Sequence, residues 1–451
     1  MLTTFDIDVS KSVNRFSDYT NEMESLIHSV RNLDQNKVTD LIGPRILNGE
    51  ATMALQRLVP INIRKDAGLF FTSKNISDKV AHRVIPMLQR GSKILDPACG
   101  AGNLIIACAQ HLPIGHNLGE TLTLWSDKIF GYDLYEEFIH ATKLRLSLLA
   151  ISIHPNEINL LPNLQLHKLF KGLKAVDGLS HSYIDQDTCI VVNPPFGHIP
   201  APSDCKWGTG KTQVAAWFLE RLLLKTIQGQ NVVAILPDVL RSGTRYLKWR
   251  NMISSLCTSI DIEEAGQFDN NTDVDVFILH VVRGNSIGTQ LYWPTHNSLI
   301  GQSKHVVSDF FDVCVGPVVP HRDPLQGPSY PYIHARTAPA WQTIDFIPED
   351  RQYTGKVFSP PFLVIHRTSS PSDRHRCVTT IINEKRDVAV ENHLLIIQPH
   401  DRSLHSCKQL LRLLKSPETD KWLNNRIRCR HLTVSAIREL PCSTIGPDKQ
   451  Q

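Results

Sequence analysis

Short apolar runs of β type alternate with amphipathic helical segments between residues 66 and 285, and this alternation limits the fold more than any other feature of the chain. The runs read SKILD, KIFGYD, TCIVVN, NVVAILP and VFILHVV, and VAAWFLERLLLKTI is the clearest amphipathic segment. Strands that alternate with helices form βαβ units, which build a mostly parallel sheet covered by helices on both faces. The pattern therefore predicts an α/β domain over 66–285.

The chain on either side of this region has a different pattern. Residues 1–65 are polar and carry apolar residues at helical spacing, which predicts an N-terminal helical segment. Residues 286–360 are rich in proline and glycine, as in a loop-rich junction, and 361–451 combine short apolar runs with a helical LLRLLK. We therefore expect the junction to lead into a smaller C-terminal α+β domain. The chain would then have three parts, namely residues 1–65, 66–285 and 286–451.

The charge of the chain is uneven. The net charge is +4, but residues 351–451 hold 17 Lys and Arg against 9 Asp and Glu, a net of +8, which leaves about −4 for the remainder. This basic end predicts a polyanion partner, and a solvated basic surface is the alternative.

Membrane and secreted proteins are disfavoured. No apolar run reaches the ~18 residues that a membrane span needs, and MLTTFDIDVSKSVNRFSDY lacks a basic-then-apolar signal pattern. The 10 cysteines include no Cys-x-x-Cys pair, which argues against a zinc ribbon and favours reduced thiols. We therefore expect a cytoplasmic protein without a bound metal.

A strand that turns on glycines occupies residues 92–103, SKILDPACGAGN. The apolar strand ends at Asp96, and the turn before the apolar helix LIIACAQ contains Ala98, Gly100 and Gly102. Glycines let the backbone approach a ligand closely, and the free N–H groups at a helix start favour an anion. The turn can therefore hold a nucleotide or a carboxylate, and a tight turn without a ligand is the alternative.

A second acid, Asp133, ends the run KIFGYD, 37 residues after Asp96. An acid at the end of the second strand suits hydrogen bonds to ribose hydroxyls, although the usual gap is about 20 residues. The alternative is an N-cap for the helix that EEFIHATKL begins, and the two roles are compatible.

The stretch CIVVNPPFG, residues 189–197, places Asn193 at the end of a buried strand. Pro194 and Pro195 cannot donate to a neighbouring strand, so the strand stops at the carboxyl edge where open α/β sheets bind ligands. The side-chain carbonyl of Asn193 and the backbone carbonyl of Pro194 can each accept one N–H of an exocyclic amine. An amine held in this way can act as a nucleophile in a displacement that depends on positioning and needs no metal. Phe196 can stack on a base rotated out of a duplex, and a core phenylalanine is the alternative.

Two further motifs predict no chemistry. Residues 359–362, SPPF, precede the run FLVIHR instead of following a strand, so a proline pair leading into a strand explains them. WGTGKT lacks the first glycine of a phosphate-binding loop, because Cys205 stands in its place. We interpret 198–212 as a loop beside the strand end, which contacts DNA through Lys206 and Lys211 or is simply solvated.

Together, Asp-Pro-Ala-Cys-Gly-x-Gly and Asn-Pro-Pro-Phe resemble motif I and the catalytic motif of gamma-type N6-adenine DNA methyltransferases. GLFFTSKNISDKVAHRV at 68–84 resembles motif X of this family, with Thr72 at the matching position. GQFDNNTDVDVFILHVV at 266–282 places Phe268 at the family's second base-stacking position. The resemblance covers about 66–285 well.

This resemblance implies a Rossmann-like domain that binds S-adenosyl-L-methionine (AdoMet) through a group of residues at the strand ends, namely Thr72, Asp96, Ala98, Gly100, Gly102 and Asp133. It implies a catalytic group that consists of Asn193, Pro194, Pro195 and Phe196. Adenine flipped out of double-stranded DNA would enter a pocket between Phe196 and Phe268, and the C-terminal α+β domain would be a target recognition domain.

Two features depart from the family or extend it. The family usually carries an acid after the third strand, which binds the adenine of AdoMet, but LQLHKLFKGLK contains none and Asp177 lies out of register. We therefore expect cofactor binding to be unusual or the site to be degraded. In the C-terminal domain, Arg426, Arg428 and Arg430 would share one face of a strand and contact DNA, and a solvated surface is the alternative.

The sequence therefore predicts a sequence-specific enzyme that methylates the N6 amine of a flipped adenine, as the modification enzyme of a restriction–modification system of Type II or of the Type I modification-subunit kind. Because recognition and catalysis share one chain, we expect no separate specificity subunit, and we expect no restriction activity in this chain itself. We also expect a monomer that acts on double-stranded DNA, and a cognate restriction endonuclease for the same site is the candidate partner. The alternatives are methylation of cytosine N4, of protein glutamine or of RNA, and a non-catalytic DNA-binding subunit.

Overall fold

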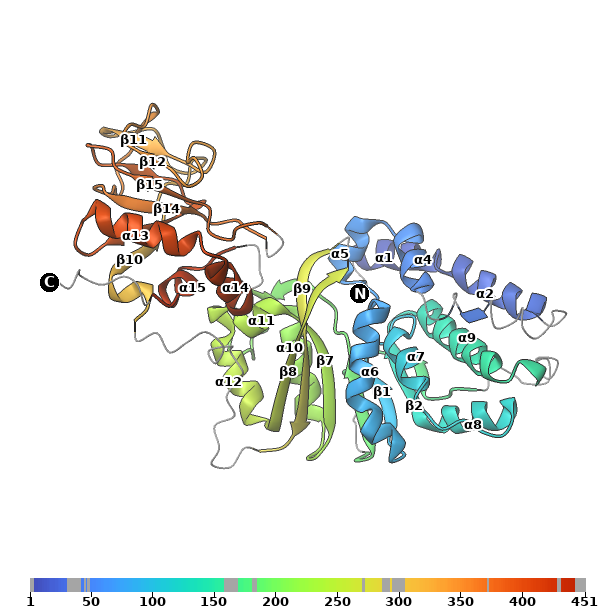
Figure 1. Cartoon of the computed structure of the whole chain (residues 1–451). Helices are drawn as coiled ribbons and strands as arrows, with labels where there is room; N and C mark the ends of the chain where they lie inside the picture. Colours follow the sequence, from blue (N-terminus) through green and yellow to red (C-terminus); the bar gives the residue numbers. More distant parts are fainter. Residues whose placement is uncertain are drawn as a thin grey trace. The chain divides into compact units, whose positions relative to one another are not determined.

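The computed structural model describes residues 4–30, 42–43, 46, 49–157, 169–180, 185–269, 272–285, 293, 305–370, 373–427 and 431–442 (Figure 1). The chain divides into two compact units. Unit 1 comprises Met1–Arg241 and Arg245–Pro294, and unit 2 comprises Ser242–Thr244 and Thr295–Gln451.

The core of unit 1 is a seven-stranded sheet in the order β3-β2-β1-β4-β7-β9-β8. Its strands are β1 (Lys93–Asp96), β2 (Ile129–Asp133), β3 (Leu173–Ala175), β4 (Thr188–Val192), β7 (Asn231–Pro237), β8 (Cys257–Asp269) and β9 (Thr272–Arg283). The first five strands in this order are parallel, and β9 pairs antiparallel with both β7 and β8. The predicted α/β architecture with a mostly parallel sheet is therefore confirmed.

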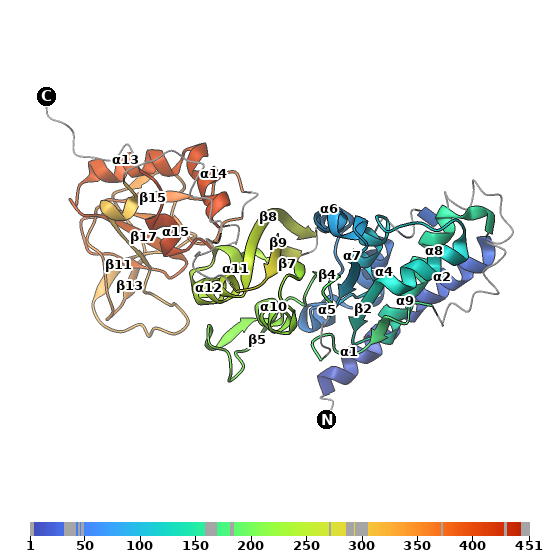
Figure 2. The same ribbon diagram turned by 90° about the horizontal axis from the view of Figure 1, so that it is seen from below.

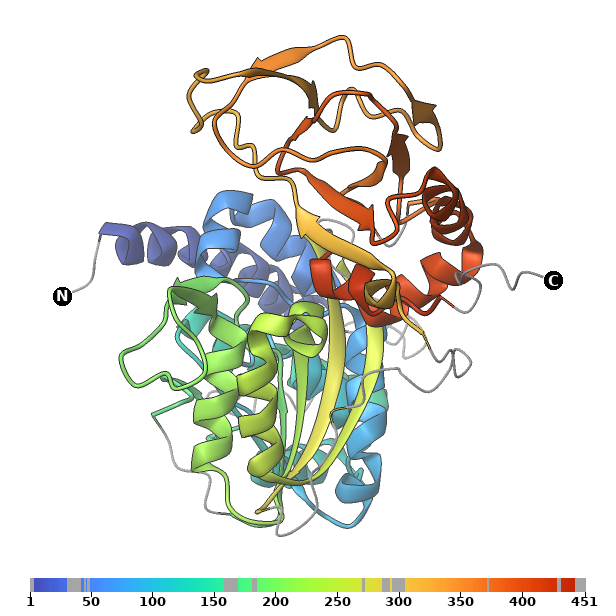
Figure 3. The same ribbon diagram turned by 90° about the vertical axis from the view of Figure 1, so that its left-hand side faces the viewer.

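Strand side chains alternate between two apolar cores, one on each face of the sheet. On β4, Val191 packs into the first core, whereas Ile190 and Val192 pack into the second. The first core is covered by α6 (Lys74–Gln89), α7 (Asn103–Ala109), α8 (Leu118–Lys128) and α9 (Glu136–Ile153). The second is covered by α10 (Val214–Lys225), α11 (Asp238–Ser242) and α12 (Leu247–Ser255), which are drawn in green shades in Figure 3. Helices on both faces explain why the central strands β4 and β7 are buried along almost their whole length.

The N-terminal helices belong to the first of these cores. They are α1 (Thr4–Asn14), α2 (Ser17–Val30), α4 (Glu50–Leu58) and α5 (Ile61–Ala67), and α2 runs beside α9 in Figures 1 and 2. The Phe16 ring packs edge-on against Phe71 and Phe138, with centroid distances of 5.8 and 5.1 Å. The helices that precede residue 66 therefore pack as part of unit 1.

Unit 2 contains a five-stranded sheet in the order β10-β17-β14-β15-β12 and a smaller sheet in the order β13-β11-β16. The first is built from β10 (Phe311–Val315), β17 (Leu394–Pro399), β14 (Phe362–His366), β15 (Thr379–Ile382) and β12 (Thr343–Ile344). The second is built from β13 (Asp350–Gln352), β11 (Ser329–Ile333) and β16 (Ala389–Val390). One face of the larger sheet packs against the helices α13 (Leu404–Leu414), α14 (Pro417–Arg426) and α15 (Val434–Arg438). Unit 2 is therefore an α+β structure.

The second proline pair leads into a strand, as predicted, because β14 begins at Phe362 and this side chain is fully buried. Among the helices that the structure describes, none combines the length and the apolar character that a bilayer crossing requires.

Candidate active site

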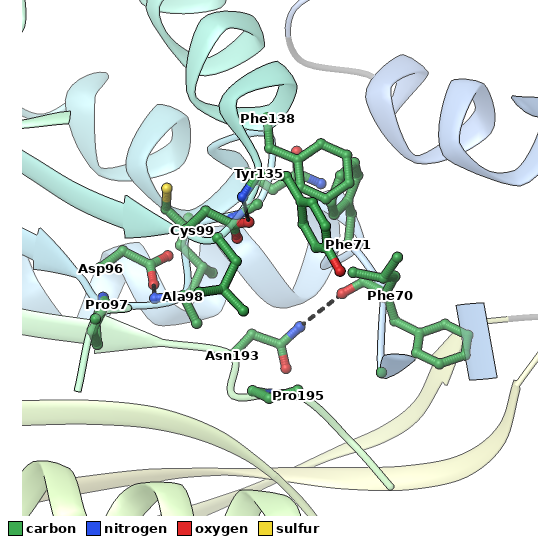
Figure 4. Close-up of a pocket in the computed structure, with 18 of the residues that line it drawn as sticks. Phe70, Phe71, Asp96, Pro97, Ala98, Cys99, Tyr135, Phe138, Asn193 and Pro195 are labelled. Atoms are coloured by element: carbon green, nitrogen blue, oxygen red, sulfur yellow. Dashed lines mark hydrogen bonds between the residues drawn. The ribbon is translucent and has the colours of Figure 1, made fainter. Parts of the chain in front are cut away.

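The parallel strands β1, β2, β3 and β4 lie side by side, and a cavity of about 880 Å³, which includes space open to solvent, lies at their carboxyl ends. Residues from five stretches line it, within 68–72, 96–104, 133–138, 176–178 and 193–195, together with Phe218 of α10. Figure 4 shows Asp96, Tyr135 and Asn193 arranged around this space. Because the carboxyl ends of parallel strands meet at one edge, side chains far apart in the sequence converge here.

The cavity brings most of the predicted site residues of unit 1 together. Those that line it are Thr72, Asp96, Ala98, Gly100, Asp133, Asn193 and Pro195. Those that lie outside its lining are Gly102, Pro194, Phe196, Lys206, Lys211 and Phe268.

The glycine turn after β1 needs its glycines for two reasons. Gly100 and Gly102 adopt φ values of 52° and 82°, in the left-handed region that favours glycine. A Cβ on Gly100 would lie 2.7 Å from the Phe71 ring, and one on Gly102 would lie 2.6 Å from the Thr142 methyl group. The Thr142 hydroxyl donates to the Gly100 carbonyl at 3.1 Å, so α9 holds the turn in place.

Two acids lie together beneath this turn. Asp96 is 1% exposed, and its Oδ1 accepts from the backbone N–H of Ala98 at 3.0 Å. Burial raises the pKa of Asp96 to about 8, against the Ala98 hydrogen bond, which lowers it. Asp133 accepts from the N–H groups of Gly100 and Tyr135 at 2.9 and 3.1 Å, and burial still raises its pKa to about 6. Ligand groups that are cationic or that donate hydrogen bonds would therefore be stabilised beside this pair.

A third acid lies in the cavity wall, in contrast to the expectation that the third strand is followed by none. Strand β3 is Leu173–Ala175, so Asp177 is the second residue after the strand, and it lines the cavity with Val176 and Gly178. Asp177 Oδ1 accepts from the N–H of Leu179 at 2.9 Å. The expectation failed because Asp177 was judged out of register with the region LQLHKLFKGLK, whereas β3 forms only at the end of that region, at Leu173–Ala175.

The Asn193 side chain is held by its amide nitrogen. Asn193 Nδ2 donates to the backbone carbonyl of Phe70 at 3.2 Å and to the Thr72 hydroxyl at 3.1 Å (Figure 4 shows the first of these bonds). Because the Phe70 carbonyl only accepts, the amide must present its NH₂ group to that side. Asn193 Oδ1 is buried and has no hydrogen-bond partner among the described residues. The side chain therefore offers one unused acceptor at the cavity wall.

The aromatic pair predicted for base stacking is closed. The Phe196 and Phe268 rings pack against each other at a centroid distance of 5.3 Å and an interplanar angle of 61°. Phe268 is 1% exposed. A base stacked between two parallel rings needs about 7 Å between the planes of the rings, because each of the two stacking contacts takes up half of this distance. A base therefore fits between these rings only after one of them moves.

The loop that follows the proline pair forms a short hairpin from β5 (His198–Pro200) and β6 (Lys211–Gln213). Lys206 and Lys211 are both exposed on it. Arg245 donates to the Thr209 and Lys211 carbonyls, which ties the hairpin to the segment before α12.

In unit 2, the predicted arginine strand is not observed at the residue that the structure describes. Arg426 is the last residue of α14 and pairs with Glu439, with a distance of 2.9 Å between Arg426 Nε and Glu439 Oε2. Arg428 and Arg430 lie outside the described residues.

Several lining residues were missed by the reading of the sequence. They are mainly apolar or aromatic and include Phe70, Phe71, Leu134, Tyr135, Phe138 and Phe218. Leu134 follows Asp133 directly and is 67% exposed, so its place after a strand-end acid was a usable signal. Phe138 and Phe218 carry no such signal, because apolar spacing on a helix does not separate core from cavity. Phe70 and Phe71 lie within the segment 68–84, where the resemblance singled out only Thr72.

Comparison with known proteins finds one family profile and several solved structures that resemble this chain. A profile described as N-6 DNA Methylase matches residues 55–280, or 226 of the 451 residues. No curated protein sequence matches the chain. Among solved structures, a protein from Listeria monocytogenes assigned as a class I S-adenosylmethionine-dependent methyltransferase is 15% identical, with a TM-score of 0.37, over 58% of this chain and 72% of its own.

Two further structures have restriction–modification names. A modification subunit assigned to a type I restriction enzyme of Vibrio vulnificus YJ016 is 19% identical, with a TM-score of 0.35, over 52% of this chain and 49% of its own. The type IIG restriction endonuclease BpuSI is 14% identical, with a TM-score of 0.45, over 89% of this chain and 62% of its own. The chain therefore spans less than two thirds of either protein.

Proposed function

Since the chain belongs to the N-6 DNA methylase family, we propose that it transfers a methyl group from AdoMet to the N6 amine of an adenine flipped out of double-stranded DNA. The observation that carries this proposal is the fixed Asn193 amide. Its NH₂ group is used by Phe70 and Thr72, and its Oδ1 is left as a buried acceptor. A buried acceptor without a partner is costly, and an amine N–H of a substrate would remove that cost.

The chemistry of the cavity lining fits AdoMet. When bound, AdoMet supplies the methyl group from a sulfonium centre. The acids Asp96, Asp133 and Asp177 would accept from its ammonium, ribose hydroxyls and adenine amine, and Leu134 and Phe218 offer apolar contacts to the adenine ring. Asp177 would serve as the family's acid after the third strand. The proposed cofactor residues from the sequence, Thr72, Ala98, Gly100 and Gly102, would shape the rest of this site.

The catalytic group would then act by position. Asn193 Oδ1 and the Pro194 carbonyl would each accept one N–H of the adenine amine, which draws its lone pair out of the ring and toward the methyl group. Pro195 fixes the chain at the strand end. Phe196 and Phe268 would separate to admit the base, which must leave the duplex to reach this edge of the sheet.

We assign target recognition to 286–451, whose described residues from 305 onward fall within unit 2. We assign phosphate contacts to Lys206, Lys211 and the arginines at 426, 428 and 430. In this proposal the protein is the modification enzyme of a restriction–modification system, and a cognate endonuclease acts on the same site. The basic charge of 351–451, 17 Lys and Arg against 9 Asp and Glu, suits a polyanion partner.

The test is methyl transfer from labelled AdoMet to duplex DNA of mixed sequence, with the product nucleosides identified by mass spectrometry. We expect N6-methyladenine. N4-methylcytosine would retain the mechanism and change the base, and unlabelled DNA with bound AdoMet would refute a DNA substrate.

Asn193→Ala supplies the test of mechanism. We expect kcat to fall by about 10²- to 10³-fold, as for loss of a single transition-state hydrogen-bonding group, while the dissociation constant of AdoMet stays close to the wild-type value. Asn231→Ala is the matched control, because Asn231 begins β7 and contacts His280 at 3.0 Å, at the opposite end of the strands from the cavity. An equal loss of AdoMet binding and activity in Asn193→Ala would show that Asn193 is structural.

A further inference from the structure

A buried arginine lies behind the glycine turn. Arg145 belongs to α9 and is 2% exposed. Its guanidinium donates to the Ala101 carbonyl in the turn, to the Ile46 carbonyl at 2.7 Å, and to Asn103 Oδ1 at 2.6 Å. Burial of this charge is expensive, and burial lowers its pKa. Two of the three oxygen partners of this buried cation, the Ala101 carbonyl and Asn103 Oδ1, lie at the glycine turn and at the start of α7. This arrangement calls for an explanation beyond packing.

Asn103 connects Arg145 to the segment before α6 through hydrogen bonds on both sides of its amide. Because guanidinium is a donor only, Asn103 must present Oδ1 to Arg145, which leaves Nδ2 on the other side. Asn103 Nδ2 donates to the Thr72 carbonyl at 2.6 Å and to the Thr52 hydroxyl of α4 at 3.2 Å. Arg145 and the Thr72 carbonyl therefore set the orientation of the Asn103 amide together.

Thr72 completes the connection to the catalytic strand end. Its hydroxyl accepts from Asn193 Nδ2 at 3.1 Å, and its side chain is 3% exposed. Two bonds, to the Thr72 hydroxyl and the Phe70 carbonyl, turn the Asn193 amide so that Oδ1 points away from both of these acceptors. Both of these acceptors belong to the stretch whose backbone Asn103 holds at Thr72.

We propose that Arg145 is a positioning residue for methyl transfer, which fixes the orientation of the Asn193 amide through Asn103 and Thr72. The Ile46 carbonyl and Thr52 of α4 extend the same network into the chain before residue 66, so this part of the chain contributes to the geometry of the transfer step. The expected effect of Arg145 on kcat rests on the proposed function. Its effect on the orientation of the Asn193 amide does not.

The guanidinium suits this role better than any other side chain. Its planar fork can hold several oxygens at fixed angles, whereas an ammonium acts as a point charge on a flexible stem. Misplacement of a reacting group by about 1 Å can cost about 10²-fold in rate. Arg145→Met is therefore expected to lower kcat by about 10- to 100-fold, and Arg145→Lys to restore part of the loss.

A double-mutant cycle tests the connection, because residues in one network give non-additive effects. Thr72→Val keeps the shape of the side chain and removes the acceptor that holds Asn193. If Arg145 acts through Thr72, the double variant has nearly the kcat of the slower single variant. Leu122→Ala is the stability control, since Leu122 is a fully buried residue of α8 in the same core. A double variant whose loss is the product of the two single losses, or a similar fall of kcat in Leu122→Ala, would overturn the proposal.

A second readout does not depend on turnover. In the full chain labelled with ¹⁵N-asparagine, the Asn193 side-chain amide signals can be assigned by their absence in Asn193→Ala. We expect Arg145→Met to shift or broaden these signals and Leu122→Ala to leave them unchanged. If wild-type protein methylates no DNA, the proposed function fails, and the amide signals still decide the network. Unchanged Asn193 signals in Arg145→Met would refute it.

Discussion

Replacement of Asp96 by asparagine is expected to stabilise the ligand-free protein at neutral pH. The folded carboxyl has a pKa of about 8 because of burial, against an ordinary value of 3.8. Between these two values the unfolded chain has released the proton and the folded chain retains it. The free energy of unfolding therefore falls as the pH rises, by about 1.4 kcal/mol per pH unit.

The size of the effect follows from this slope. A pH of 7 is about three units above the pKa of Asp96 in the unfolded chain. The wild-type carboxyl therefore lowers the free energy of unfolding at pH 7 by about 4 kcal/mol, compared with a side chain that does not titrate. Asparagine keeps the Oδ1 acceptor for the Ala98 N–H, which is 3.0 Å from the carboxylate oxygen, and it carries no charge to desolvate. Asp96→Asn is thus expected to be more stable than wild type by about 4 kcal/mol at pH 7 and by about 1 to 2 kcal/mol at pH 5.

Urea denaturation at pH 5, 6, 7 and 8, followed by tryptophan fluorescence, measures this difference, and Trp125 and Trp249 are fully buried reporters in unit 1. Asp133 titrates nearby in both proteins, with a pKa of about 6, so its own contribution largely cancels in the comparison. A stability difference that does not change between pH 5 and pH 8 would refute the raised pKa of Asp96. The same variant is expected to bind AdoMet more weakly, because the proposed site loses an acid.

Two glycine substitutions test the walls of the cavity. A Cβ on Gly178 would lie 1.9 Å from the Pro97 carbonyl oxygen, so Gly178→Ala should displace the segment after β3 and weaken AdoMet binding, as measured by calorimetry. Gly119→Ala is the control and should leave AdoMet binding unchanged, because the nearest atom to its Cβ would be 3.5 Å away. A Cβ on Gly68 would lie 2.7 Å from the Phe196 carbonyl oxygen at a φ of 67°, so Gly68→Ala should lower kcat by more than it weakens AdoMet binding, and unchanged kinetics would contradict this packing.

The parts of the site at the ends of strong strands could be predicted from the sequence. Asp96 and Asn193 each end an apolar run, and the parallel pairing of β1 with β4 brings both ends to one edge. The sequence pattern predicts where these two strands end, because an apolar run indicates the strand and a proline or glycine indicates where it stops.

The weak edge strand could not be placed in the same way. Strand β3 has only three residues, Leu173–Ala175, and Lys174 is exposed on it. Such a strand is specified by its pairing with β2 and not by local hydrophobicity, so Asp177 was judged out of register. The mistake concerned the position of the strand, and the acid itself was visible in the sequence.

Arg426 illustrates a different limit, since on a strand it would share a face with Arg428 and Arg430. The structure places it at the end of a helix, because Ser416 caps α14 through a hydrogen bond to the Thr419 N–H, and Pro417 opens the helix. Serine followed by proline is a helix-start signal, and it outweighs the spacing of charged residues ten positions later. The relation of Phe196 to Phe268 likewise depends on tertiary packing, which no local pattern contains.

Five separate stretches of chain, together with Phe218 of α10, form the walls of the cavity at the strand ends. Any ligand that bridges these stretches binds only the folded protein, so occupancy must appear as a rise in melting temperature. A ligand at 100 times its dissociation constant adds about 2.7 kcal/mol to the free energy of unfolding. Melting curves therefore rank AdoMet, its demethylated product and synthetic inhibitors without a DNA substrate, and without knowledge of the recognition sequence.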